Sequence, residues 1–189
     1  MTRAPDTSAS TAAVPADVAA AATARGLPPL APAGYHRFDT LAEHAAAFAA
    51  LLARACRTVD VFDIALGPAF DRPAHIDRLR DFLAADRNNR VRIVLHDARS
   101  ASRDCPRLCA LLRRHSEAIA IHQTTGAAQS VADPLLVVDA VHALRRFHHA
   151  QPRSALYTDD PAGVRPLADR FEQIFEASEP ALAATTLGL

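Results

Sequence analysis

The chain has 189 residues, of which half are hydrophobic, so it has room for one domain with a sizeable core. Its 21 basic side chains, all of them arginine, balance 21 acidic ones. A formal net charge of zero gives the whole molecule no electrostatic reason to bind nucleic acid or an anionic membrane. The absence of lysine excludes any mechanism that requires a Schiff base or a P-loop lysine.

Targeting and redox signals are sparse. No apolar run reaches the ~18 residues that cross a bilayer, and no secretory peptide is recognisable, so we predict a cytoplasmic protein without a membrane span. The three cysteines, Cys56, Cys105 and Cys109, form an odd set, which argues against a disulfide framework. Cys105 and Cys109 are one helical turn apart, but no CxxC motif or close histidine pair accompanies them. The sequence therefore predicts ordinary buried thiols, no metal site and no cofactor.

The N-terminal segment differs in composition from the rest of the chain. Residues 1–33 are mostly Ala, Pro, Thr and Ser, with few large apolar side chains. Such a segment cannot bury enough surface to offset the entropy lost on ordering the chain. We predict a disordered leader over residues 1–33 and a single domain over residues 34–189.

Helical and strand patterns alternate in the first half of this domain. Thr40-Leu-Ala-Glu43 has the form of a capping box, in which the Thr40 hydroxyl accepts from the N3 amide and Glu43 bonds back. Alternating and helical spacing of apolar residues defines the elements that follow. The predicted elements are a helix over residues 40–55, a strand over Thr58–Leu66, a helix over residues 73–86, a strand over Arg90–His96 and a helix from an Asp104 cap to about His115.

Strands dominate the second half. Pro134–Asp139 (PLLVVD) is a continuous apolar run of the kind that fills a buried central strand. Asp160 followed by Pro161 is typical of a helix start. The predicted elements are strands over Ala118–His122, Pro134–Asp139 and Val141–His149, and a long helix from Asp160. The whole order predicts an α/β domain with helices on both faces of a mixed β-sheet.

This succession resembles one repeat of the phospholipase D superfamily over roughly Arg57 to Ser178. A strand that ends in Asp139, a turn, a second strand and a closing amphipathic helix look like the region that carries the superfamily's His-x-Lys-x4-Asp signature. Counting back from Asp139 places Ala132 where the histidine stands and Pro134 where the lysine stands. The superfamily's Gly-Ser-x-Asn element would fall at residues 146–149, which read Arg-Phe-His-His here.

The resemblance implies the architecture without its described active site, and hence no catalytic residue. Phosphodiester cleavage of this type needs an imidazole that attacks phosphorus and a cation that holds the phosphoryl oxygens, and alanine and proline supply neither. Active members combine two repeats, in one chain or in a dimer, whereas this chain has room for one. It is similar to an uncharacterised bacterial branch with a single degenerate repeat, which predicts an inactive homodimer.

The candidate binding residues lie in a basic stretch, Val141–Arg153, that no acidic side chain interrupts. On a strand, alternate residues share one face, so Arg146 and His148 would point together at an anion such as phosphate. The alternative is a solvated strand whose charges have no ligand. The candidate binding residues are Asp139, Arg145, Arg146, His148 and His149.

Asp139 also belongs to a group of aspartates at predicted strands or strand ends. The others are Asp60, Asp63 and Asp97. Open α/β sheets place ligands at such ends, where a carboxylate pair could do acid/base work. Strand-end aspartates also commonly cap the next helix or turn, which is the role that we favour.

Three hypotheses of function remain. The first is a non-catalytic binding or assembly module that pairs with itself and binds an anionic ligand through arginines. The second is a phosphodiesterase or nuclease with a rebuilt active site that uses His148 or His149. The third is a nucleic-acid binder that uses the eight arginines of residues 87–114. Aromatic residues make up only 5% of the chain, which disfavours base stacking by such a protein.

Overall fold

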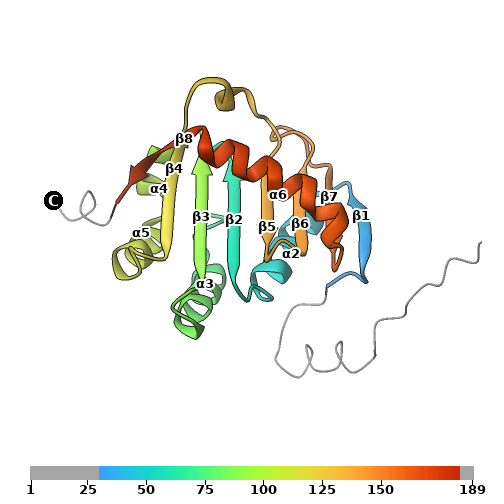
Figure 1. Cartoon of the computed structure of the whole chain (residues 1–189), viewed down its shortest axis with the longest axis horizontal. Helices are drawn as coiled ribbons and strands as arrows, with labels where there is room; N and C mark the ends of the chain where they lie inside the picture. The colour runs from blue at the N-terminus through green and yellow to red at the C-terminus, as the bar shows by residue number, and fades with distance from the viewer. Residues whose placement is uncertain (1–29, 184–189) are drawn as a thin grey trace, which may run out of the picture.

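The computed structural model describes residues 30–183, which form one eight-stranded mixed β-sheet with five helices (Figure 1). The strand order is β1-β7-β6-β5-β2-β3-β4-β8, in which β2, β3 and β4 are parallel and the other neighbouring pairs are antiparallel. The strands are β1 (Gly34–Phe38), β2 (Thr58–Asp63), β3 (Arg90–Leu95), β4 (Ile119–Thr124), β5 (Leu135–Val138), β6 (His142–Arg146), β7 (Ser154–Thr158) and β8 (Ser178–Leu182). The helices are α2 (Leu41–Leu52), α3 (Pro73–Ala85), α4 (Ala98–Asp104), α5 (Pro106–Arg114) and α6 (Pro161–Glu176). The predicted leader lies outside the described residues, apart from residues 30–33.

The predicted mixed sheet with helices on both faces is confirmed. In Figure 1, α6 crosses one face diagonally from β7 towards β8, and the other helices pack on the opposite face. Side chains alternate between the two faces along each strand, so Leu136 joins the core under α2, α3 and α5 while Leu135 joins the core under α6. All four residues of β5 are buried, and β5 lies in the middle of the sheet, as its apolar run predicts.

Two predicted helix starts are confirmed. Thr40 Oγ1 accepts the Glu43 amide at 3.2 Å and Glu43 Oε2 accepts the Thr40 amide at 3.1 Å, which completes the capping box of α2. Asp160 Oδ1 accepts the Gly163 amide at 2.9 Å at the start of α6. Within residues 30–183, no helix combines the length and the apolar character that a membrane span requires.

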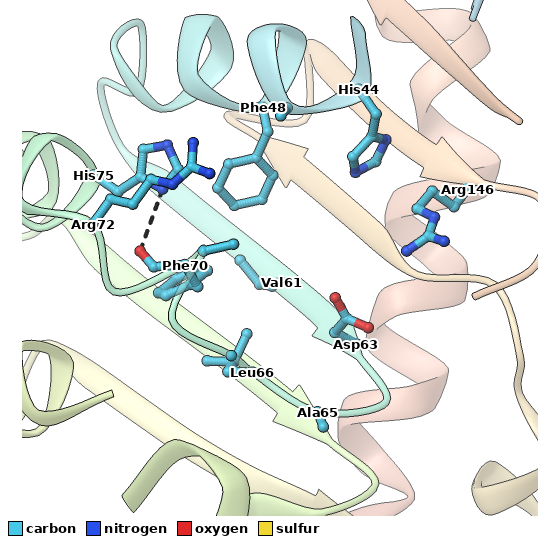
Figure 2. A pocket seen from close by; sticks show the side chains of 13 residues that line it. His44, Phe48, Val61, Asp63, Ala65, Leu66, Phe70, Arg72, His75 and Arg146 are labelled. Atoms are coloured by element: carbon cyan, nitrogen blue, oxygen red, sulfur yellow. Dashed lines mark hydrogen bonds between the residues drawn. The ribbon is translucent and has the colours of Figure 1, made fainter. Parts of the chain in front are cut away.

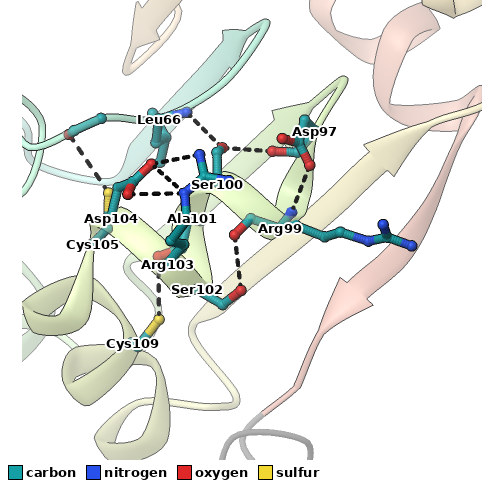
Figure 3. Close-up of polar contacts among 11 residues, drawn as sticks. Leu66, Asp97, Arg99, Ser100, Ala101, Ser102, Arg103, Asp104, Cys105 and Cys109 are labelled. Carbon is teal, nitrogen blue, oxygen red and sulfur yellow. Dashed lines mark hydrogen bonds and ion pairs between the residues drawn. The ribbon is translucent and has the colours of Figure 1, made fainter.

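The predicted helix after Asp104 is wrong at its start. Asp97 caps a separate short helix, α4, and Asp104 is the last residue of α4 (Figure 3). The start of α5 is capped instead by Asp71, which is distant in sequence and accepts the amides of Arg107 at 3.1 Å and Leu108 at 2.8 Å. The prediction failed because a local pattern of Asp and Pro cannot reveal a cap that comes from another part of the chain.

The strand prediction was wrong at both sheet edges and at the end of β6. The predicted strand Val141–His149 stops at Arg146, because the chain turns there and returns as β7. β1, β7 and β8 were not predicted. Each has only five residues, and β1 and β8 lie at the edges of the sheet, where the apolar alternation that marks a half-buried strand is weak.

Candidate ligand-binding site

A pocket of about 270 Å³ opens at the carboxyl end of β2, between α2 and the loop that joins β2 to α3 (Figure 2). Here the sheet changes from parallel to antiparallel pairing, because β2 pairs with β3 on one side and β5 on the other. Open α/β sheets bind ligands outside the carboxyl ends of their strands at such switch points. The larger side chains that line the pocket are His44, Phe48, Val61, Asp63, Leu66, Phe70, Arg72, His75 and Arg146.

One wall of the pocket is aromatic. The ring of Phe48 on α2 meets the ring of Phe70 edge-on, with centroids 5.8 Å apart, and lies 5.5 Å from the ring of His75 on α3. His75 Nδ1 is 3.3 Å from the Phe70 carbonyl oxygen, which ties the loop to α3. The Leu66 amide donates to Ser100 Oγ on α4 at 3.0 Å and holds the other end of the same loop. The wall is therefore a fixed part of the fold.

Asp63 supplies a carboxylate at the end of β2. Its Oδ1 accepts the amide of the next residue, Ile64, at 2.7 Å. Burial raises the pKa of Asp63, although that amide and the positive charges of Arg146, His149 and His96 act in the opposite direction. A carboxylate in this position gains stability from any cation that reaches it.

Arg146 supplies a guanidinium at the end of β6. Its Nε and Nη2 donate to the Gln151 carbonyl oxygen at 3.2 and 2.8 Å, and Nη2 also donates to the His149 carbonyl oxygen. These bonds fix the plane of the guanidinium, because both acceptors belong to the backbone of the turn after β6. Among the described residues, Nη1 has no hydrogen-bond partner, so this nitrogen remains available to a ligand.

His44 on α2 is the third polar group of the pocket. Its Nδ1 is buried, and within residues 30–183 it has no hydrogen-bond partner. Burial, together with the nearby charge of Arg146, lowers the pKa of His44 to about 4. The imidazole is therefore neutral near pH 7, with one nitrogen that can donate and one that can accept.

Sequence reasoning missed His44 and the aromatic wall. One signal was available for His44, which lies three and seven residues before Ala47 and Leu51 on the buried side of α2. A histidine on the inward face of an alanine-rich helix usually either packs in the core or belongs to a binding site. Phe48, Phe70 and His75 come together only through the packing of α2 on the β2–α3 loop, which no local pattern encodes.

Arg145, a predicted binding residue, lies on the opposite face of the sheet from Arg146. Its Nε donates to Asp133 Oδ2 at 2.9 Å, and Asp133 also pairs with Arg170 of α6. The Arg145 guanidinium lies 5.9 Å from the centre of the Phe147 ring. Arg145 thus helps to hold α6 on the sheet and does not reach the pocket with Arg146.

The predicted shared face of Arg146 and His148 is wrong, because β6 ends at Arg146. His148 and His149 follow in the turn, where their rings stack with centroids 4.6 Å apart. The Ala150 amide donates to His148 Nδ1 at 3.1 Å, so this nitrogen is an acceptor within the turn.

Asp139 lies at the far end of β5 from the pocket. Its carboxylate accepts the amides of Cys56, Arg57 and Thr58 at 2.7 to 2.8 Å, just before β2 begins. The residue itself has a left-handed backbone, with φ of 56°, in the tight turn to β6. Asp139 thus holds the segment before β2, which is distant in sequence, and does not cap the next helix or turn as predicted.

Ala132 and Pro134, the positions predicted to correspond to the superfamily's histidine and lysine, lie next to the end of β6 and its turn. Pro134 borders a hollow that also touches His44 and Asp63. The Pro134 carbonyl oxygen accepts the Arg146 amide at 2.9 Å, and the Ala132 carbonyl oxygen accepts the His149 amide at 2.8 Å. The segment before β5 therefore borders the end of β6 and its turn, but it carries only a methyl group and a pyrrolidine ring at those two positions.

The eight arginines of residues 87–114 do not form one surface. Arg92 pairs with Asp60 at 2.7 Å and with Glu172 on the α6 side of the sheet. On the opposite side, Arg103 pairs with the adjacent Asp104, and Arg107 with Asp71. Three of the eight arginines are thus partly neutralised, and they are divided between two faces of the molecule.

The two cysteines that lie one helical turn apart pack in the protein interior as free thiols. Cys105 and Cys109 are both buried, as predicted, and burial raises the pKa of the Cys105 thiol to about 12. In the part of the chain that the structure describes, no three His, Cys, Asp or Glu side chains are grouped to hold a metal ion.

Solved structures with a similar fold include phospholipase D family members. Nuc from Salmonella typhimurium, a phospholipase D family member, is 14% identical, with a TM-score of 0.52 over 79% of this chain and 96% of Nuc. NucT from Helicobacter pylori is 13% identical, with a TM-score of 0.51 over 78% of this chain and 98% of NucT. TrmBL2, an archaeal chromatin protein, is 9% identical, with a TM-score of 0.61 over 88% of this chain, which spans 61% of TrmBL2. At these identities the likenesses show the fold alone, and the fold is phospholipase D-like.

Sequence comparison gives a family without an assigned activity. No match to this chain is found among the curated proteins. The family model described as "Domain of unknown function (DUF7931)" matches residues 40–187, which is most of the chain. The chain therefore belongs to the DUF7931 family.

Proposed function

We propose that this chain is a non-catalytic binding module that holds a small ligand, through an anionic group, in the pocket at the carboxyl end of β2. The observation that carries the proposal is the guanidinium of Arg146, which lines the pocket and is fixed by backbone carbonyls through two of its nitrogens. A guanidinium held in this way is prepared to bind a carboxylate or a phosphate. The apolar wall favours such a bond, because it lowers the local dielectric constant.

The groups beside the pocket support binding without turnover. A phosphodiesterase of this superfamily needs an imidazole and a cation on the strand segment that here carries Ala132 and Pro134. The second hypothesis would replace that imidazole with His148 or His149. Neither residue lines the pocket, and Nδ1 of His148 already accepts a backbone amide. A rebuilt active site therefore has less support than a binding site.

Nucleic-acid binding has less support as well. TrmBL2 is described as a chromatin protein with a novel mode of DNA binding, and its fold is similar to this one. The arginines of residues 87–114 nevertheless lie on two faces, and three of them are in ion pairs. A duplex needs a continuous basic surface, because each contact with a phosphate contributes only a part of the binding free energy.

We also propose that the module pairs with itself, as the resemblance to a two-repeat superfamily implies. Light scattering coupled to a sizing column would then give about twice the chain mass of 20.2 kDa. A mass near 20.2 kDa at micromolar concentration would remove this part of the proposal without affecting the pocket.

Calorimetric titration with inorganic phosphate and benzoate tests the binding site. We expect Arg146→Gln to weaken binding of these anions by roughly tenfold or more, since the variant removes the guanidinium that the turn after β6 holds at this end of the pocket. Arg113→Gln, at an exposed arginine of α5, is the matched control and should bind as the unchanged protein does. Circular dichroism at the titration temperature would establish that both variants are folded.

Two outcomes would contradict the proposal. If Arg146→Gln is folded and binds the anions as tightly as the unchanged protein, the pocket is not the binding site. Turnover of bis(p-nitrophenyl) phosphate, lost in His148→Ala or His149→Ala, would replace the proposal with the rebuilt phosphodiesterase.

A further inference from the structure

The pocket presents both signs of charge at the same end. In Figure 2 the carboxylate of Asp63 and the guanidinium of Arg146 lie across a short gap, and the imidazole of His44 points towards the same gap. Within residues 30–183 there is no ion pair between Asp63 and Arg146, and Oδ2 of the carboxylate makes no hydrogen bond. The two groups therefore face the same pocket without pairing with each other.

The rest of the pocket is small and mostly apolar. Phe48, Val61, Leu66 and Phe70 line it, with the two aromatic rings edge-on to each other, and Arg72 and His75 border it beside them. A volume of about 270 Å³ lies just below the lower end of the usual range for small-molecule sites, roughly 300 Å³. One ring or one branched apolar group, together with a compact polar head, would fill it.

We infer that the ligand of this pocket is a zwitterion of the α-amino-acid type, whose carboxylate binds Arg146, whose ammonium binds Asp63 and whose apolar side group packs against Phe48 and Phe70. This inference rests on the proposed function and deepens it, because it adds a positive group beside the anionic one. The charges of the ligand would match those of the pocket: its carboxylate and its ammonium, which share one carbon atom, would meet the guanidinium at the end of β6 and the carboxylate at the end of β2.

A simple anion would fit the same end poorly. Its negative charge would lie near the carboxylate of Asp63, which has no partner of its own among the described side chains. Burial of a charge without a partner is costly, and a like charge nearby increases that cost. An ammonium on the ligand removes the problem, since it pairs with Asp63 while the carboxylate pairs with Arg146.

Three probes of one size test the inference by calorimetry at pH 7.5: L-phenylalanine, 3-phenylpropionate, which lacks the ammonium, and 2-phenylethylamine, which lacks the carboxylate. We expect L-phenylalanine to bind roughly tenfold or more tightly than either of the other two. Asp63→Asn keeps the shape and the acceptor for the Ile64 amide but removes the charge, so it should abolish the advantage over 3-phenylpropionate. Asp81→Asn, at an exposed aspartate of α3, is the matched control and should preserve it.

The outcomes separate this inference from the proposed function. If 3-phenylpropionate or phosphate binds as tightly as L-phenylalanine, and Arg146→Gln weakens that binding, the zwitterion is overturned while the anion site stands. Equal binding of L-phenylalanine to folded Asp63→Asn and to the unchanged protein also overturns it. If none of the probes, phosphate included, binds the unchanged protein at millimolar concentration, both proposals fail.

Discussion

The half-buried imidazole of His44 should make the stability of the protein depend on pH in a defined window. Unfolded histidine takes up a proton near its ordinary pKa of 6.5, whereas burial holds the pKa of His44 at about 4 in the folded state. Below pH 6.5 the unfolded state therefore binds more protons, and stability falls as the pH is lowered towards 4. Lowering the pKa from 6.5 to about 4 corresponds to roughly 3 to 4 kcal/mol in full, at about 1.4 kcal/mol per pH unit, and about 3 kcal/mol of it is lost by pH 4.

His44→Leu isolates this contribution. At pH 7.5 the variant should be at least as stable as the unchanged protein, because leucine removes a buried nitrogen that has no partner. As the pH is lowered from 7.5 to 4, the variant should lose about 3 kcal/mol less of its free energy of unfolding. Other histidines with lowered pKa values, His75, His122 and His142, remain in both proteins and cancel in the comparison.

Urea unfolding followed by far-ultraviolet circular dichroism is the appropriate assay, since the chain has no tryptophan. Leu41→Gln, an exposed position on the same helix, is the control and should keep the pH dependence of the unchanged protein. If the curves of stability against pH for His44→Leu and the unchanged protein run parallel from pH 7.5 to 4, the reasoning about His44 is refuted.

Three further changes test contacts outside the pocket, each by urea unfolding. Asp139→Ala removes the acceptor of three backbone amides before β2 and should lower the free energy of unfolding by about 3 kcal/mol; an unchanged stability would show that Asp139 does not hold this segment. Asp133→Ala leaves Arg145 and Arg170 without their shared carboxylate and should cost about 2 kcal/mol, whereas a neutral effect would show that the triad does not hold α6. Gly163→Ala places a methyl group against the Asp160 carboxylate, so it should cost about 1 kcal/mol through the lost cap, and the cost should be smaller when Asp160 is already alanine.

The interior of the fold could be predicted from the sequence because its signals are local. The apolar run of β5 and the capping residues of α2 and α6 each lie within a few consecutive residues. The edge strands could not be predicted in this way, because their stability comes from backbone hydrogen bonds to distant strands. The cap of α5 is a similar case, since Asp71 comes from the loop before α3.

The pocket shows the same limit. Asp63 and Arg146 could each be selected from the sequence, one as a strand-end aspartate and the other as part of a basic stretch. Their proximity could not be predicted, because it depends on β5 entering the sheet between β2 and β6. Arg145 illustrates the reverse: it is adjacent to Arg146 in sequence, but strand alternation sends it to the other face.

The pairing of β1 with β7 has a consequence for how the chain acquires its structure. Gly34 and Thr158, which face each other in this pair, are 124 residues apart in sequence, and the link from Cys56 to Asp139 spans 83 residues. Contacts of such long range require the closure of large loops, and proteins rich in them reach the native state slowly. During synthesis, β1 leaves the ribosome long before β7 exists, so its hydrogen-bonding groups stay exposed to water, to chaperones and to other nascent chains until most of the domain has been translated.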